Sequence, residues 1–562
     1  MVQRILNIFN KEFTGLHQAA YLLGVFALLS QVLALVRDRL LAHTFGASTT
    51  LDVYYAAFRI PDFIYISIAS FVSITVLIPF LVEKIDQNSE YGGDRARAFL
   101  SDVFSFFFLT ILFVSGVAFL MTPFLANFIV PGFSPEEKKI FIDLTRILLV
   151  SPVLLGISSL LGSVTQTYRK FFVYAGAPVL YNLGIITGII FFFPLFGVVG
   201  MVLGVILGAS LHLLVQFPVV MKHGLIPRFR WHMNFSDIKR VVMLSLPRTI
   251  ALSSNHISLI ALIALASYMV EGSIAVFNFS FNLQSVPLSI IGVSYSVAAF
   301  PTLTRLFSNG ERIKFAEHIV AATRHIVFWI TPAIILFIVL RAQIVRTILG
   351  SGEFDWSDTR LTAAALAVFS VSILAQALVL LFVRGYYAAG RTKIPLVVNT
   401  FSSALIIILG FVSMKMFQTN DMFRYFIESL LRIDDISGSA IVMLPLAYSM
   451  GMIINALLLG LFFSRDFKEF SLPLKRVFAH IFAASVIMGF VAYRFLSVFG
   501  SMFDINTFWG ISLQGLFAGG LGIVAGILVL QMLGNREIEE VSANLKRRLF
   551  GVRVIAPDQE EL

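Results

Sequence analysis

Residues 22–79 read LLGVFALLSQVLALVRDRLLAHTFGASTTLDVYYAAFRIPDFIYISIASFVSITVLIP. This stretch holds two long apolar segments, and polar and charged side chains lie within them or close to their ends. A bare charge in hydrocarbon costs at least a few kcal/mol, so such groups usually face a water-filled path or a charged ligand. The stretch therefore predicts a membrane protein with a polar cavity. The side chains concerned are Gln31, Arg37, Asp38, Arg39, Asp52, Arg59 and Asp62.

The composition of the whole chain agrees with a membrane protein. Of its 562 residues 58% are hydrophobic and 13% are charged, whereas an ordinary soluble domain has about 25% charged residues. At about 20 apolar residues per helical crossing, the chain contains roughly fourteen candidate spans. The runs are continuous and do not alternate as barrel strands do, so we expect an all-α polytopic protein. The spans are 18–40, 52–83, 99–125, 140–165, 175–195, 197–221, 239–268, 273–305, 314–341, 360–385, 395–416, 440–463, 474–496 and 508–533.

The charge pattern predicts the topology. The net charge is +10, but the basic residues are scattered between apolar spans, which argues against a nucleic-acid partner. With a cytoplasmic N-terminus, roughly 26 Lys and Arg lie inside and about nine outside, so both termini are expected in the cytoplasm. Apolar side chains recur at helical spacing in residues 1–17, which predicts an interfacial amphipathic helix. The chain has no cysteine, which excludes disulfides and thiolate metal sites.

The chain contains signs of an internal duplication. Pro178 and Asn182 after one basic loop are matched by Pro395 and Asn399 after another. Six spans separate the pairs, so both halves are expected to have the same orientation, as in transporters built from parallel repeats. The predicted domains are an N-terminal lobe at 18–221, a second lobe at 222–463, two additional helices within 464–533 and a cytoplasmic tail at 534–562.

Charged residues of the first two spans are the main candidates for a binding site. Asp52 and Arg59 are seven residues apart and so share one helical face. Arg59 and Arg37 are suited to an anionic head group, because guanidinium binds two phosphate oxygens at once. Asp52, Asp38 and Arg39 are candidate gate residues and charge partners. The same charges could instead form a structural ion-pair network, and the sequence leaves both interpretations open.

Two further faces are candidates for cavity lining. Asn278 and Asn282 begin a polar stripe on the eighth predicted span, and Arg248 and Asn255 share a face of the seventh. Polar side chains also hydrogen-bond membrane helices to one another, so this pattern fits a cavity and helix packing equally well.

Enzyme motifs are missing from the sequence. It contains no G-x-x-x-x-G-K-[ST] loop, no H-E-x-x-H and no G-x-S-x-G on a soluble strand-turn-helix. We therefore expect no enzyme, no nucleotide cofactor and no metal. Transport would be driven by an ion gradient, the membrane potential or the cargo's own gradient.

Several segments carry a resemblance to a known family. SQVLALVRDRLLAHTFGASTTLDVYYAAFRIP at 30–61 strongly resembles the opening of the MurJ/MviN lipid II flippases, which are members of the multidrug/oligosaccharidyl-lipid/polysaccharide exporter superfamily. Further matches are LGSVTQTYRKFF at 161–172, FPTLTRL at 300–306, ILGSGEFDWSDT at 348–359 and RGYYAAGRTKIP at 384–395. The resemblance covers about residues 20–530. It implies two six-helix lobes around a cationic cavity, with two final helices that form a groove for the undecaprenyl tail.

The chain departs from the family pattern at several cations. The family has Arg at Gln31, paired arginines at Tyr65 and Ile66, Glu at Ser70 and Arg at Asn282. Arg248 is a candidate replacement. An acidic residue associated with sodium in some members falls at Leu262, so sodium coupling is not expected.

The resemblance implies a flippase of the bacterial inner membrane that moves lipid II, an undecaprenyl-pyrophosphate-linked peptidoglycan precursor, to the outer leaflet by alternating access. Arg37, Arg59 and Arg248 would attract the pyrophosphate, with Asp38 and Asp52 pairing with arginines at the outer gate. Membrane lipids and cell-wall synthesis proteins are the expected partners. The alternatives are a flippase for another lipid-linked glycan such as an O-antigen unit, a drug/cation antiporter, and a non-transporting scaffold for envelope assembly.

Overall fold

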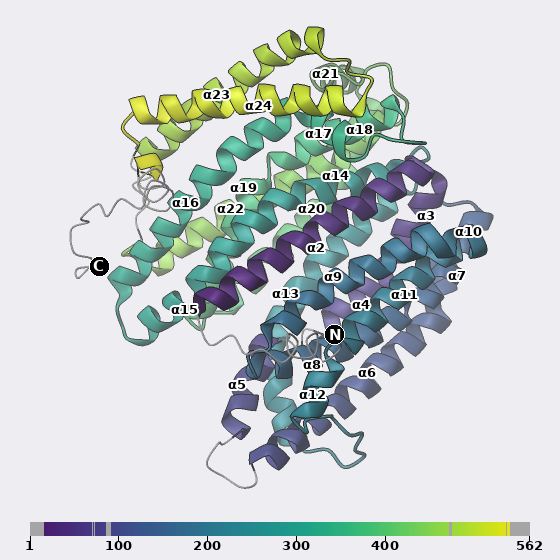
Figure 1. Cartoon of the computed structure of the whole chain (residues 1–562), viewed down its shortest axis with the longest axis vertical. Coiled ribbons are helices and arrows are strands. Elements are labelled where there is room, and N and C mark those ends of the chain that lie inside the picture. The colour runs from purple at the N-terminus through teal and green to yellow at the C-terminus, as the bar shows by residue number, and fades with distance from the viewer. Residues whose placement is uncertain are drawn as a thin grey trace, which may run out of the picture. The chain divides into compact units, whose positions relative to one another are not determined.

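The described part of the chain is entirely helical. The computed structural model describes residues 16–69, 71, 74–85, 92–470, 475–535 and 537–539, and these residues contain no β-strand (Figure 1). The predicted interfacial helix at 1–17 lies outside the described residues except for its last two positions, which begin α2 (Leu16–Phe45). Of the predicted tail at 534–562, residue 536 and residues 540–562 also lie outside them.

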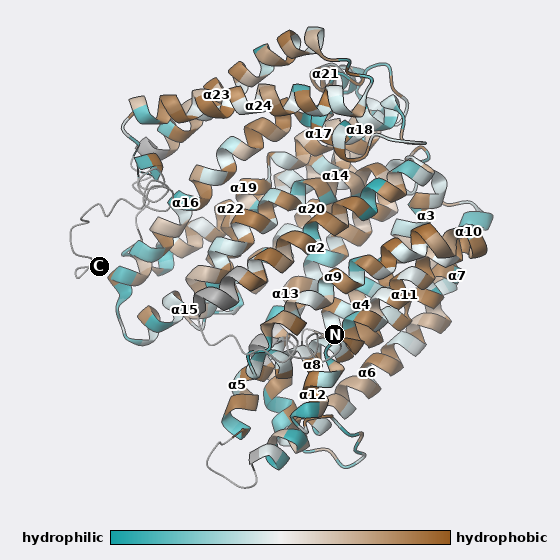
Figure 2. Ribbon diagram, in the orientation of Figure 1, coloured by the Kyte–Doolittle hydropathy of each residue, from teal (hydrophilic) through white to brown (hydrophobic). Residues whose placement is uncertain are grey.

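Eleven helices within the described residues are long and apolar enough to cross a membrane, or twelve if a pair bent by 42° at residues 370–373 counts as one span. Figure 2 shows apolar residues along most of their length. The predicted spans 18–40 and 52–83 coincide with α2 and with three shorter helices, α3 (Thr49–Ala57), α4 (Arg59–Ala69) and α5 (Ile74–Lys84). The all-α polytopic fold is confirmed, while the number fourteen stays a prediction.

By its contacts the chain divides into two compact units. The first contains residues 1–283, 348–365 and 392–451, and the second contains 284–347, 366–391 and 452–562. The predicted lobe boundaries stay predictions. Besides α2 to α5, the first unit is built from α6 (Gly92–Ile129), α7 (Pro135–Leu148), α8 (Val150–Thr167), α9 (Phe171–Thr187), η1 (Gly188–Phe192), α10 (Phe193–Phe196), α11 (Val198–Leu214), α12 (Phe217–Lys222), α13 (Phe235–Ala266), most of α14 (Ser273–Pro287), the start of α18 (Trp356–Ser370), α20 (Lys393–Thr419), α21 (Asp421–Leu431), η3 (Ser439–Val442) and the start of α22 (Met443–Asp466).

The second unit carries the last two long helices. α23 (Lys475–Met502) and α24 (Phe508–Met532) pack side by side (Figure 1). After α24, Glu537 is 3% exposed and its Oε1 lies 3.6 Å from Nε of Arg324 on α16 (Arg312–Val339). This ion pair and an apolar cluster join α16 to the end of the described chain. The unit also contains η2 (Leu288–Val293), α15 (Ser294–Ser308), α17 (Arg341–Ile348) and α19 (Ile373–Ala388).

Glycines hold α9 and η1 against α11 in the first unit. A Cβ on Gly184 would lie 2.3 Å from Cα of Gly208, and one on Gly188 would lie 2.5 Å from Cα of Gly204. Both pairs recur at four-residue spacing, which places them on one face of each helix. Small residues at this spacing let membrane helices approach closely, and this approach brings Asn182 on α9 toward the interior of the unit.

We expect Gly204→Ala to destabilise the first unit. Its Cβ would lie 2.4 Å from Cα of Gly188, so the two helices must separate. Overpacking of this kind costs about 1–3 kcal/mol, which thermal unfolding of the detergent-solubilised chain measures. Gly116→Ala on α6 is the matched control, because its Cβ would have no neighbour within 4 Å. Equal unfolding temperatures for the two variants would contradict the close packing.

Candidate functional site

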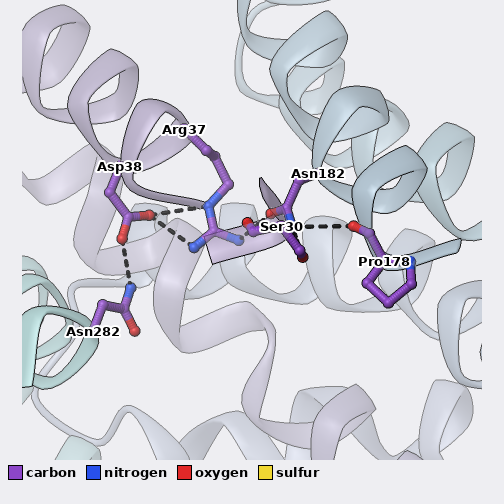
Figure 3. Close-up of polar contacts among 6 residues, drawn as sticks. All are labelled: Ser30, Arg37, Asp38, Pro178, Asn182 and Asn282. Carbon is purple, nitrogen blue, oxygen red and sulfur yellow. Dashed lines mark hydrogen bonds and ion pairs between the residues drawn. The ribbon is translucent and has the colours of Figure 1, made fainter. Parts of the chain in front are cut away.

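A hydrogen-bonded network surrounds Arg37 on α2. The Nε and Nη2 of Arg37 donate to Oδ1 of Asp38 at 3.0 and 2.8 Å (Figure 3). Its Nη1 donates to Oδ1 of Asn182 on α9 at 3.3 Å. Asn182 donates from Nδ2 to the hydroxyl of Ser30 at 3.2 Å. Oδ2 of Asp38 accepts from Nδ2 of Asn282 on α14 at 3.0 Å. We call these five residues the Arg37 network.

Arg59, the first residue of α4, reaches the same helix by a separate contact. Its Nη2 donates to Oδ1 of Asn278 on α14. Its Nε is buried and has no hydrogen-bond partner among the described residues. Asp62 and His256 are close enough to interact with Arg59 electrostatically. A neutral amide thus holds a guanidinium group that keeps one buried donor unused.

The two arginines meet α14 one helical turn apart. Asn278 and Asn282 differ by four positions, so they lie on one face about 6 Å apart along the helix axis. Asn278 bonds Arg59 directly, and Asn282 bonds Arg37 through Asp38. The polar stripe that the sequence indicated on this helix is therefore turned toward both arginines.

Asp52 has different partners from those expected. We predicted that it would pair with arginines, but its Oδ2 accepts from the backbone N–H of Gly272 and its Oδ1 from that of Ala275, both at 2.8 Å. The first backbone N–H groups of a helix have no partner within the helix, and the helix dipole favours a negative charge there. Asp52 on α3 therefore caps the N-terminus of α14. Asp38 does pair with an arginine, as expected.

Residues near the end of α2 make contacts with residues 348–358 and with Gly272. Arg39 donates from Nη1 to the carbonyl oxygen of Ile348 at 3.1 Å, and the backbone N–H of Ala47 donates to Oδ2 of Asp358 at 2.9 Å. Gly272, at φ +82°, packs so closely that a Cβ there would lie 2.2 Å from the carbonyl oxygen of Ala47. Together with the cap by Asp52, these contacts bind the α2–α3 connection to residues 271–275 and 348–358. We call this set of contacts the α14 cap.

Three other predicted site residues are less closely defined. Gln31 lies half-buried on α2, and Arg248 and Asn255 lie half-buried on α13. Their role as cavity residues stays a prediction.

Sequence reasoning missed two residues of the Arg37 network. Asn182 was identified only as a marker of the internal repeat, and Ser30 only as part of a family motif. A signal for Asn182 was available, because an amide within an apolar span needs a hydrogen-bonding partner. Its Nδ2 also donates to the carbonyl of Pro178, four residues earlier, at 3.1 Å.

Leucine fills the position where the family resemblance places an acidic residue. Leu262 is fully buried, and a Cβ on Gly410 of α20 would lie 3.1 Å from its Cδ2. No group of three or more His, Asp or Glu side chains that could hold a metal ion occurs in the described ranges. Leu262 thus packs closely against α20.

Comparisons with known proteins agree on one family. A family model described as "Lipid II flippase MurJ" matches residues 41–513. The probable lipid II flippase MurJ of Buchnera aphidicola subsp. Acyrthosiphon pisum is 28% identical over 389 residues, 68% of this chain and 75% of that protein. The lipid II flippase MurJ of Burkholderia cenocepacia is 25% identical over 389 residues, with coverage of 68% and 75%.

Solved structures show the same fold. A lipid II flippase MurJ in an inward closed conformation matches with a TM-score of 0.70 and 23% identity, over 94% of this chain and all of that one. An inward-facing multidrug resistance MATE family transporter of the MOP superfamily matches with a TM-score of 0.62 and 15% identity, over 78% and 95%.

Proposed function

We propose, from the premise that the chain belongs to the MurJ family of lipid II flippases, that it moves lipid II from the cytoplasmic to the outer leaflet of the bacterial inner membrane. It does so by alternating access, with both termini in the cytoplasm. No catalytic step is involved in this function. The membrane character rests on the long apolar helices, and the choice of cargo rests on the family.

One observation carries the proposal: Arg59 directly, and Arg37 through Asp38, are hydrogen-bonded to adjacent turns of one face of α14. A pyrophosphate has two phosphate groups in direct succession, and two guanidinium groups can each bind one of them with paired N–H donors. Arg59 is held by a neutral amide and keeps an unused Nε donor. An anionic cargo that displaces the amide of Asn278 would complete the hydrogen bonding of Arg59, and at Arg37 it would take the place of Asp38 or Asn182.

The α14 cap supplies the outer gate in this mechanism. With the cap made, Asp52 satisfies the backbone N–H groups of Gly272 and Ala275 at the start of α14. This closed contact would shut the outer side. Opening to the outside breaks the cap, and the freed carboxylate and N–H groups then bind water. Release of the cargo to the outer leaflet lets the cap re-form, which returns the chain to the state open to the cytoplasm.

Transport would be driven by the membrane potential, an ion gradient or the cargo's own gradient, and if an ion is coupled we expect that it is not sodium. Leu262 presents hydrocarbon where a sodium site needs oxygen ligands. Replacing sodium by potassium on both sides of proteoliposomes should leave the flipping rate within about twofold, because no site loses its ligand. As the matched comparison, the flipping rate is measured in the same vesicles with a membrane potential of either sign imposed. A rate that falls in parallel with the sodium concentration would contradict this expectation.

Complementation of a strain depleted of its lipid II flippase tests the proposed function. Growth rescue, with flipping of labelled lipid II in vesicles that contain the purified chain, is the expected result. Flipping of a different undecaprenyl-linked glycan without rescue would favour an O-antigen type of cargo. If vesicles flip no lipid-linked glycan while the chain still associates with cell-wall synthesis proteins, the chain is a scaffold.

A further inference from the structure

A cavity lies wholly within the first unit, lined by residues of α2, α4, α8, α9 and α11 and by Gln216, which precedes α12. Its volume is about 550 Å³, which is within the range of small-molecule sites, about 300–1,000 Å³. Hydroxyl, amide, imidazole and aromatic groups line it, among them Phe26, Ser30, Tyr65, Tyr174, His212 and Gln216. No Asp, Glu, Lys or Arg is among the described residues that line it.

A polar cluster forms one wall of this cavity. Gln216 donates from Nε2 to the hydroxyl of Ser158 at 2.5 Å, and that hydroxyl lies 2.7 Å from Nδ1 of His212. Gln216 is 1% exposed, and its Oε1 has no hydrogen-bond partner among the described residues. A Cβ on Gly162, another lining residue, would lie 3.2 Å from this oxygen. A buried acceptor without a partner costs free energy that a ligand donor would recover.

The lining selects a class of ligand. A cavity without a charged side chain gives no compensation to a phosphate or an ammonium group, so it does not suit a charged ligand. Neutral hydrogen-bonding groups beside aromatic rings suit an uncharged ligand that has both polar and apolar faces, such as a sugar ring. The Oε1 of Gln216, which has no partner among the described residues, can accept a hydrogen bond from an N–H or O–H group. The amide and hydroxyl groups of an N-acetylated sugar are such donors. Tyr65 lines the cavity at a position where the family pattern has an arginine.

The cavity is directly joined to the Arg37 network. Ser30 lines the cavity, and its hydroxyl accepts from Asn182, whose Oδ1 accepts from Arg37. One side chain, Asn182, therefore separates the cavity wall from a guanidinium of the proposed pyrophosphate site. In lipid II the first sugar is bonded directly to the pyrophosphate, so a cargo whose phosphates are bound at Arg37 would carry its first sugar next to them.

We propose that this cavity, which we call the Gln216 pocket, binds an N-acetylated sugar of the cargo, next to the pyrophosphate held by the arginines. The proposal rests on the proposed function for the identity of the pyrophosphate site. It assigns to Gln216, Ser158 and Tyr65 the selection of glycan-bearing carriers over bare undecaprenyl pyrophosphate. Arg37 and Arg59 bind the part that both lipids share.

The test compares two lipids that differ only in the glycan and its peptide. The affinity of the purified full-length chain in detergent is measured for lipid II and for undecaprenyl pyrophosphate. We expect the wild type to prefer lipid II, and Gln216→Leu to reduce this preference by about tenfold, as the loss of one to two hydrogen bonds predicts. The affinity of Gln216→Leu for undecaprenyl pyrophosphate should stay unchanged. Equal loss for both lipids, or no loss for either, would overturn the proposal.

Two further variants keep the result interpretable. Tyr65→Phe removes a single hydroxyl, which lies 3.2 Å from the hydroxyl of Ser159, and should lower the preference without unfolding the chain. Gln284→Leu is the matched control, because Gln284 is also fully buried but belongs to the second unit. It should leave the preference for lipid II unchanged.

A third lipid separates this proposal from the proposed function. If the wild type does not bind lipid II, the proposed function fails, and the pocket is then tested with undecaprenyl pyrophosphate that carries one N-acetylhexosamine. A preference for that lipid over the bare carrier that falls in Gln216→Leu would support the pocket alone. A wild type that binds no glycan-bearing carrier more tightly than the bare one would overturn it.

Discussion

Arg59→Glu is expected to abolish flipping. The carboxylate would repel the pyrophosphate at a position where Arg59 attracts it, next to the amide of Asn278. Removing one partner of a buried charged contact costs about 2–5 kcal/mol, and reversal of the charge is more severe, so the flipping rate should fall by about 100-fold or more. Flipping of labelled lipid II in proteoliposomes measures this loss, and the depletion strain should not grow.

The control variants separate charge from folding. Arg95→Glu makes the same change of charge at an exposed position of α6, and it should flip normally. Arg59→Lys keeps the charge but loses the planar pair of donors, so intermediate activity is expected. Expression of Arg59→Glu should remain near that of the wild type. Normal flipping by Arg59→Glu would refute a role of this cation in transport.

Asp52→Ala is expected to open the outer gate. The backbone N–H groups of Gly272 and Ala275 would lose their acceptor at the start of α14. Loss of a cap and of buried hydrogen bonds together cost about 2–4 kcal/mol, so the ratio of closed to open gate should fall by about 30- to 1,000-fold. Asp52→Asn keeps one carbonyl acceptor and should lie between the wild type and Asp52→Ala. Flipping should slow in the order of these losses.

Accessibility of a single cysteine measures the state of this gate. The chain has no native cysteine, so Ser273→Cys provides one label site beside the cap. Ser273 is 4% exposed, so a membrane-impermeant maleimide added outside should react slowly in the wild-type background and rapidly with Asp52→Ala. Asp421→Ala, at an exposed carboxylate on α21, is the control and should leave the labelling slow. Slow labelling in Asp52→Ala would show that the gate does not depend on the cap.

Local pattern was enough for the chemistry of the candidate site but not for its partners. Arg37, Arg59, Asn278 and Asn282 were identified from their positions in apolar spans. It was not predictable that both arginines would be linked to α14, because that helix lies far away in the sequence. Arg59 and its partner Asn278 are 219 residues apart. Asp52 makes the same point, since its partners are backbone groups that carry no mark in the sequence.

The position of the Gln216 pocket also depends on packing. Its wall combines side chains from five helices, and the close approach of α9 to α11 through glycines brings two of these helices together. The glycines are visible in the sequence, but glycine spacing alone does not identify the helix that packs against them.

By itself the sequence determined that the chain is a helical membrane protein, which residues are charged within it, and which family it belongs to. A run of about 20 apolar residues must satisfy its own backbone hydrogen bonds in lipid, and only a helix does so locally. The tertiary structure alone decided that Asp52 caps α14, that Asn182 joins Arg37 to Ser30, and that a neutral pocket adjoins the arginines. These contacts depend on which helix faces meet, and that is decided by the sum of many weak packing contacts between residues far apart in the chain.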